Sequence, residues 1–167
     1  MGGVFTSNEP VKIILVFGII ALFIFKSITP SVAVDTIKKP NMPTSNGKTL
    51  YVGGTGEGNY TMIQSAVDDA SDGDTVFVYD EGSPYNENVE VDKSINLIGE
   101  NRETTIITTS YSYLVIVSAD WVNISGFTIL SNKVYGFRVG IDLRANYTII
   151  KGNTILNFSI GIAANGY

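Results

Sequence analysis

Three charged residues near the end of the chain are the first candidates for chemistry. The sequence predicts a strand from Phe137 to Leu143 that turns Phe137 and three aliphatic residues inward. The same alternation turns Arg138, Asp142 and Arg144 outward on one face. Such a face could hold a cation or an acidic group, which makes these residues weak catalytic candidates. The alternative, which we favour, is a ladder of surface ion pairs.

The elements that would position these residues come from an internal repeat. Residues 115–130 align with residues 141–156 at an offset of 26, with six identities in 16 positions. The identical pairs are Ala119/Ala145, Ile124/Ile150, Gly126/Gly152, Thr128/Thr154, Ile129/Ile155 and Leu130/Leu156. Such a period, built from short β-branched runs, is typical of a solenoid whose repeats bury their apolar faces by stacking. The alignment predicts equivalent inward positions for Ile124 and Ile150.

One short helix precedes most of the predicted strands. Its apolar stripe consists of Ile63, Ala66, Val67 and Ala70 at helical spacing. We expect this helix to cover the open apolar end of the first coil. Thr61 and Gln64 predict a capping box at its start. No useful helical period follows, so parallel neighbours must arise because the chain coils and stacks strand on strand.

Three runs carry a resemblance to a known family: residues 60–78, residues 84–89 and residues 93–100. They resemble the opening of right-handed parallel β-helix proteins of the pectin-lyase-like superfamily. The NosD-type branch, labelled periplasmic copper-binding and found in surface proteins of methanogenic archaea, is the most similar. The resemblance covers about Thr49 to Tyr167 and implies an all-β fold, a right-handed parallel β-helix with a short N-terminal amphipathic capping helix.

The domain organisation follows from the N-terminal segment. Residues 13–25 are an apolar run of about 13 residues, short for a bilayer span, and Ser31-Val32-Ala33 offers a cleavage site. We expect a signal peptide, or else an N-terminal membrane anchor, over residues 1–33, a linker over 34–48 and the β-helix over 49–167. The location is then secreted or cell-surface, with the membrane reached only through this segment. Because the repeat stops midway through a coil, we expect a chain truncated at its C-terminus.

Composition removes several classes of function. The sequence has no histidine and no cysteine, so it offers no imidazole or thiolate ligands for copper and no histidine base for a hydrolase. Residues 34–167 carry nine Lys and Arg against 15 Asp and Glu, which argues against nucleic acid as a partner. We expect no cofactor, and copper is disfavoured, whereas calcium stays open.

Two further patterns have simple explanations. Residues 53–58 are glycine-rich, but the Lys-Ser/Thr of a phosphate-binding loop is missing, so we expect a sharp turn. Four asparagines match the N-glycosylation pattern: Asn59, Asn123, Asn146 and Asn157.

Two functions remain. The first is a non-catalytic β-helix module that is structural, adhesive or carbohydrate-binding, with cell-envelope polysaccharide or other surface proteins as partners. The alternative is the N-terminal fragment of a polysaccharide lyase or hydrolase, because lyases of the resembled fold place an arginine base and acidic calcium ligands on this face. The repeat pairs Asp142 with Ile116 one coil earlier, so carboxylates do not stack there. We therefore favour the module.

Overall fold

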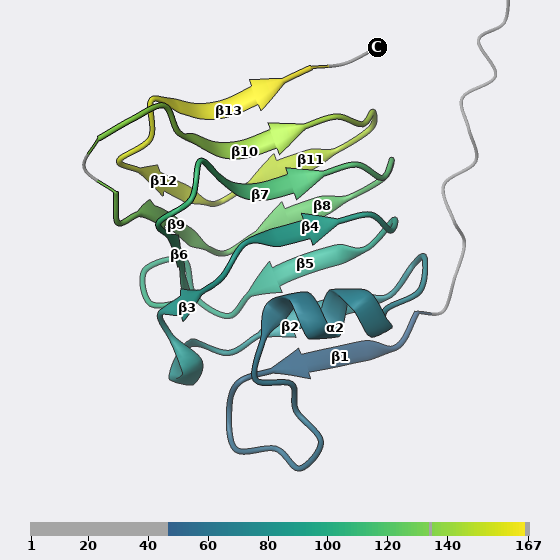
Figure 1. Cartoon of the computed structure of the whole chain (residues 1–167). Helices are drawn as coiled ribbons and strands as arrows, with labels where there is room; N and C mark the ends of the chain where they lie inside the picture. Colours follow the sequence, from purple (N-terminus) through teal and green to yellow (C-terminus); the bar gives the residue numbers. More distant parts are fainter. Residues whose placement is uncertain (1–46, 134, 166–167) are drawn as a thin grey trace, which may run out of the picture. The chain divides into compact units, whose positions relative to one another are not determined.

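The computed structural model describes residues 47–133 and 135–165. Over this range the chain forms a parallel β-solenoid of about four turns (Figure 1). The predicted signal segment and most of the predicted linker lie outside the described residues.

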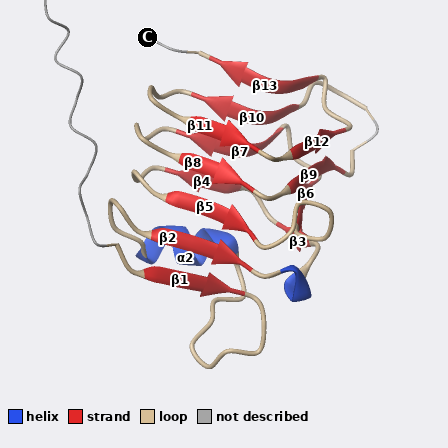
Figure 2. Cartoon of the chain, turned by 180° about the vertical axis from the view of Figure 1, so that it is seen from behind, coloured by secondary structure: helices blue, strands red, loops and turns tan. Residues whose placement is uncertain are grey.

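Three sheets, each with only parallel neighbours, form the walls of the solenoid (Figure 2). The first sheet contains, in order, β1 (Thr49–Val52), β2 (Thr75–Val78), β5 (Asn96–Gly99), β8 (Asn123–Ser125) and β11 (Ile149–Lys151). The second contains β3 (Tyr85–Asn86), β6 (Ile106–Thr109), β9 (Thr128–Ser131) and β12 (Thr154–Leu156). The third contains β4 (Val89–Val91), β7 (Tyr113–Val117), β10 (Val139–Leu143) and β13 (Ile160–Ala164). A 3₁₀ turn, η1 (Asp80–Gly82), follows β2.

The core consists of columns of inward side chains, one from each coil. The first sheet stacks Leu50, Val76, Leu97, Ile124 and Ile150 in register. Ile124 is fully buried, whereas Ile150 in the last coil is half-buried. The predicted offset of 26 is therefore the observed register, because β8 pairs with β11 through Ile124 and Ile150.

The same offset also holds in the turn before these strands. Trp121 and Tyr147, aligned by the repeat, stack with ring centroids 4.4 Å apart and planes 9° apart. Both residues have φ in the left-handed region, at 64° and 54°. Equivalent backbone conformations thus place equivalent rings on top of one another, as the repeat predicts.

Helix α2 (Ile63–Asp69) lies beside β1 and β2 at the N-terminal end of the solenoid, and its predicted stripe is buried (Figure 1). Its Gln64 side chain accepts from Glu90 N at 2.7 Å and donates to Glu90 O at 3.2 Å. The amide therefore takes the place of a neighbouring strand at the β4 edge, where backbone groups would otherwise lack partners.

The predicted capping box is wrong. The helix begins at Ile63 after Met62, which makes no side-chain cap. The Glu87 carboxylate, from the chain just before β4, accepts from Ile63 N at 2.8 Å and from Gln64 N at 2.9 Å. A residue of the next coil caps the helix because Gln64 itself is engaged with β4.

Candidate functional site

The outward side chains of the first two strands form an aromatic cluster. Leu50 and Val52 of β1 point into the core, which turns Tyr51 outward, and β2 repeats the pattern with Phe77. Tyr51 and Phe77 are register partners, with ring centroids 6.1 Å apart in an edge-to-face arrangement. Tyr79, directly after β2, stacks on Tyr51 at 5.9 Å. We call Tyr51, Phe77 and Tyr79 the aromatic shelf.

A buried tyrosine, Tyr85, supports the aromatic shelf through hydrogen bonds to the backbone. The Tyr85 hydroxyl donates to Tyr79 O at 2.7 Å and lies 3.4 Å from Val52 O. Tyr85 is only 4% exposed, and burial, more than the nearby carboxylates, raises the pKa of its phenol above the ordinary value. The backbone after β1 and after β2 is therefore tied to the core.

The glycine-rich loop forms one wall beside the shelf. Gly53 and Gly54 both adopt positive φ, and a Cβ on Gly54 would lie 2.9 Å from the Tyr79 ring. Asn59 holds the loop closed, because its Nδ2 donates to Gly53 O at 2.6 Å. The predicted sharp turn is confirmed, and the glycines let the loop approach the ring of Tyr79.

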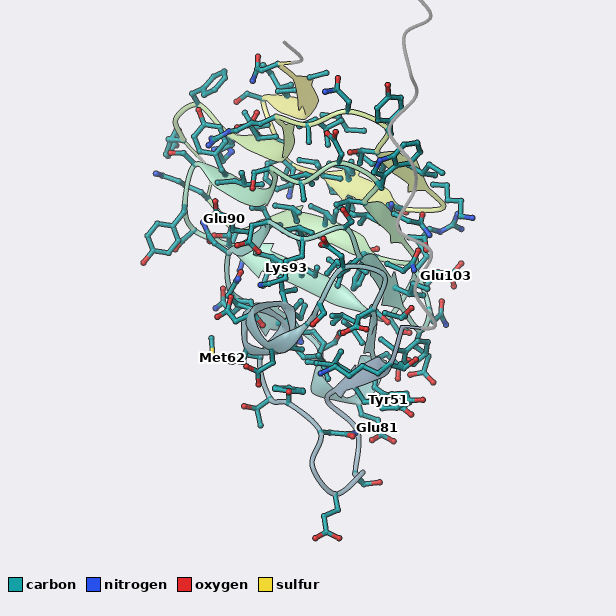
Figure 3. All side chains as sticks on the ribbon, turned by 90° about the vertical axis from the view of Figure 1, so that its right-hand side faces the viewer. Tyr51, Met62, Glu81, Glu90, Lys93 and Glu103 are labelled. Carbon is teal, nitrogen blue, oxygen red and sulfur yellow. The ribbon has the colours of Figure 1, made fainter. Side chains whose placement is uncertain are left out.

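Tyr51 and Tyr79 of the shelf and the glycine-rich loop line an open hollow of about 420 Å³. Its polar lining comprises Thr55, Asn59, Asp80, Glu81 and Glu100. Tyr51 and Glu81 are seen at the foot of the solenoid in Figure 3. None of the described residues that line this hollow carries a positive charge. We call it the acidic hollow.

The carboxylates are positioned by strand ends. Asp80 follows β2 and Glu100 follows β5, and neighbouring parallel strands end at the same edge of a sheet. Glu100 accepts from Asp80 N at 3.1 Å, while Asp80 accepts from the Thr104 hydroxyl at 2.6 Å. In the described ranges no group of three or more His, Cys, Asp or Glu could hold a metal ion. Asp80 and Glu100 of the hollow both act as hydrogen-bond acceptors.

The structure separates the three residues that the sequence groups on one outward face. Asp142 is only 3% exposed and accepts from Arg144 Nε at 2.8 Å and from Asn165 Nδ2 at 2.9 Å. This hydrogen bond raises the pKa of Arg144. Asp142 and Arg144 therefore form the predicted ion pair, with the carboxylate covered by its partners.

Arg138 does not join this pair, and the predicted strand is too long at its start. The strand begins at Val139, and Phe137, predicted to face inward, is 59% exposed. Arg138 lies in the preceding loop, where its Nε donates to Asn157 O at 3.2 Å. The alternation fails here because it requires a strand, and β10 begins only at Val139.

The four predicted glycosylation sites lie in different surroundings. Asn146 and Asn157 are exposed, each in a turn. Asn123 is half-buried in β8, 3.4 Å from the Asn96 side chain, and the amide of Asn59 is engaged with Gly53.

A membrane-spanning helix is not found in the part of the chain that the structure describes. Comparisons with protein-family models, with curated proteins and with solved structures found no match.

The aromatic shelf is not among the predictions made from the sequence, although the sequence contains a pattern that indicates it. Leu50-Tyr51-Val52 and Val76-Phe77-Val78-Tyr79 alternate aliphatic and aromatic residues, which places aromatic rings on the outer face of two strands. That these strands are neighbours, and that Glu100 belongs to the same hollow, depends on how the coils stack.

Proposed function

We propose that this protein is a non-catalytic β-solenoid module that binds carbohydrate in the acidic hollow. The observation that carries the proposal is a shelf of stacked aromatic rings, with Tyr51 43% exposed, beside carboxylates that line the same hollow. Aromatic faces pack against the apolar face of a sugar ring, and carboxylate and amide oxygens accept from its hydroxyls.

The charge of the hollow selects the class of sugar. Asp80, Glu81 and Glu100 would repel a uronate or a sulfated sugar at short range. Neutral and amino sugars have no such penalty, and an amino group would gain from the carboxylates and from the aromatic faces. We therefore propose neutral or amino oligosaccharides of a cell envelope as ligands.

The proposal also includes the location of the protein outside the cytoplasm and its membership of a family. The apolar run of residues 13–25 with Ser31-Val32-Ala33 supports a secreted or cell-surface location. The solenoid with its covering helix supports a place among right-handed β-helix proteins of pectin-lyase-like, NosD-type character. The pairing of Asp142 with Arg144, away from Arg138, favours a binding module over the lyase alternative.

The test is titration calorimetry of the full chain with chitotetraose and cellotetraose. Tyr51→Ala removes the exposed ring and should weaken binding about tenfold, a typical loss for one stacking contact. Tyr111→Ala is the matched control, because Tyr111 is exposed and does not line the hollow. Equal binding by the wild type and Tyr51→Ala would contradict the proposal. Protein isolated from its own cells should begin at Val34, and a membrane-held chain that begins at Met1 would indicate an anchor.

A further inference from the structure

A second hollow, of about 400 Å³, lies where the chain passes from the second sheet to the third. Its lining includes Lys133 and Arg138 from the connection between β9 and β10, and Asn157 and Phe158 from the connection between β12 and β13. None of the described residues that line it carries a negative charge. We call it the basic hollow.

The guanidinium of Arg138 is oriented but incompletely partnered. Its Nε donates to Asn157 O at 3.2 Å, and Asn157 holds that carbonyl from a left-handed conformation with φ of 63°. Its Nη1 is buried and has no hydrogen-bond partner among the described residues. A buried donor without an acceptor is costly, so a ligand that supplies an oxygen would favour a turn of the guanidinium that brings Nη1 to the surface of the hollow.

The charges of the basic hollow are also unpaired. Neither Lys133 nor Arg138 forms an ion pair within residues 47–133 and 135–165, whereas Lys93, Arg102 and Arg144 each do. Lys48 and Lys151 also form no ion pair within these ranges, so the distinct feature is that two such cations line one hollow. Together with the unpartnered Nη1 they fit a planar or tetrahedral oxyanion.

Exposed aromatic residues on the connection between β9 and β10 indicate which class of ligand the basic hollow would bind. Tyr135 is 83% exposed and Phe137 also projects into solvent, while Phe158 lines the hollow. Apolar faces near two cations suit a ring that carries an oxyanion better than a free inorganic ion, which is fully hydrated. We propose that the basic hollow binds the carboxylate or sulfate group of an acidic sugar, as a site separate from the aromatic shelf.

The test is a titration of the ¹⁵N-labelled full chain in neutral detergent, following the backbone amide signals together with the arginine Nε–H signals. The probes are glucuronate, glucose 6-sulfate, inorganic sulfate and neutral glucose. We expect both acidic sugars to bind and glucose not to bind. Arg138→Gln should weaken the binding of the acidic sugars about tenfold, as for the loss of one charge-assisted hydrogen bond. Binding should also fall as ionic strength rises.

Three variants make the result specific. Lys133 is exposed, so the Lys133→Gln variant should fold normally. It should also bind the acidic sugars more weakly. Lys151→Gln removes an exposed lysine of β11 that does not line the hollow, and should change nothing. Tyr51→Ala should leave this binding intact, which separates a failure here from a failure of the shelf. Binding of inorganic sulfate without either acidic sugar would overturn the proposal. Binding of the acidic sugars by Arg138→Gln and by Lys133→Gln as tight as by the wild type would also overturn it.

Discussion

The acidic hollow and the basic hollow are similar in volume but differ in the charge of their lining and in what lies beneath them. The acidic hollow, formed after β1, β2 and β5, is supported by Tyr85, which is almost fully buried and donates to the backbone of the lining residue Tyr79. The basic hollow, formed after β9 and β12, rests on the half-buried Phe158. Its neighbours in the last coil are more open, since Ile160 and Ile162 of β13 are exposed.

This difference shows where a solenoid can carry specificity. With exceptions such as Tyr85 of β3, the inward positions of all three sheets are occupied by aliphatic side chains that resemble one another from coil to coil. The outward side chains at strand ends do not have to fill the core, so they can differ from one coil to the next. Two connections of one scaffold can therefore present carboxylates in one place and cations in another.

The largest expected effect lies in the core column of the first sheet, which belongs to neither hollow. Ile124→Asp buries a charge without a partner in the fully buried middle of that column and should lower the free energy of unfolding by about 4 kcal/mol or more. Lys151→Ala, on the outer face of β11, should stay within about 0.5 kcal/mol. Urea denaturation followed by circular dichroism measures both. Equal tolerance of the two changes would contradict the described register.

A smaller effect should separate the two hollows. Tyr85→Ala removes a buried ring and the hydrogen bond to Tyr79 O, and should cost about 3 kcal/mol in the free energy of unfolding. Phe158→Ala removes a half-buried ring and should cost about half as much. The same denaturation series tests this order. If Phe158→Ala proved the more destabilising, the basic hollow would be the better supported one.

The smallest expected effect is a pH dependence that arises at Tyr85, beside the acidic hollow. Burial raises the pKa of the Tyr85 phenol above its unfolded value, so the stability it contributes is present below pH ~10 and is lost as pH rises through the folded pKa. Tyr85→Phe should flatten the decline in unfolding free energy above pH ~10. Tyr111→Phe, at an exposed tyrosine, serves as the control and should decline like the wild type. A decline that Tyr85→Phe leaves unchanged would contradict this assignment.

Some of these features could be predicted from local pattern, and others could not. The stripe of Ile63, Ala66 and Val67 and the pairing of Ile124 with Ile150 depend on spacing along the chain, and both predictions are confirmed. The inward position of Phe137 depends on where a strand begins, which alternation alone does not define. The grouping of Arg138 with Asp142 failed for the same reason.

What the sequence by itself determined is the inside of the protein: a β-solenoid whose aliphatic alternation places side chains such as Ile124 in the core, because that period is a local property of a strand. Only the tertiary structure decided which outward side chains meet. Stacked partners are 21 residues apart at Val139 and Ile160, 26 at Val115 and Ile141, and 27 at Asn96 and Asn123. Because the connections differ in length from coil to coil, the neighbours of Tyr51 or Arg138 follow from the folded path of each turn.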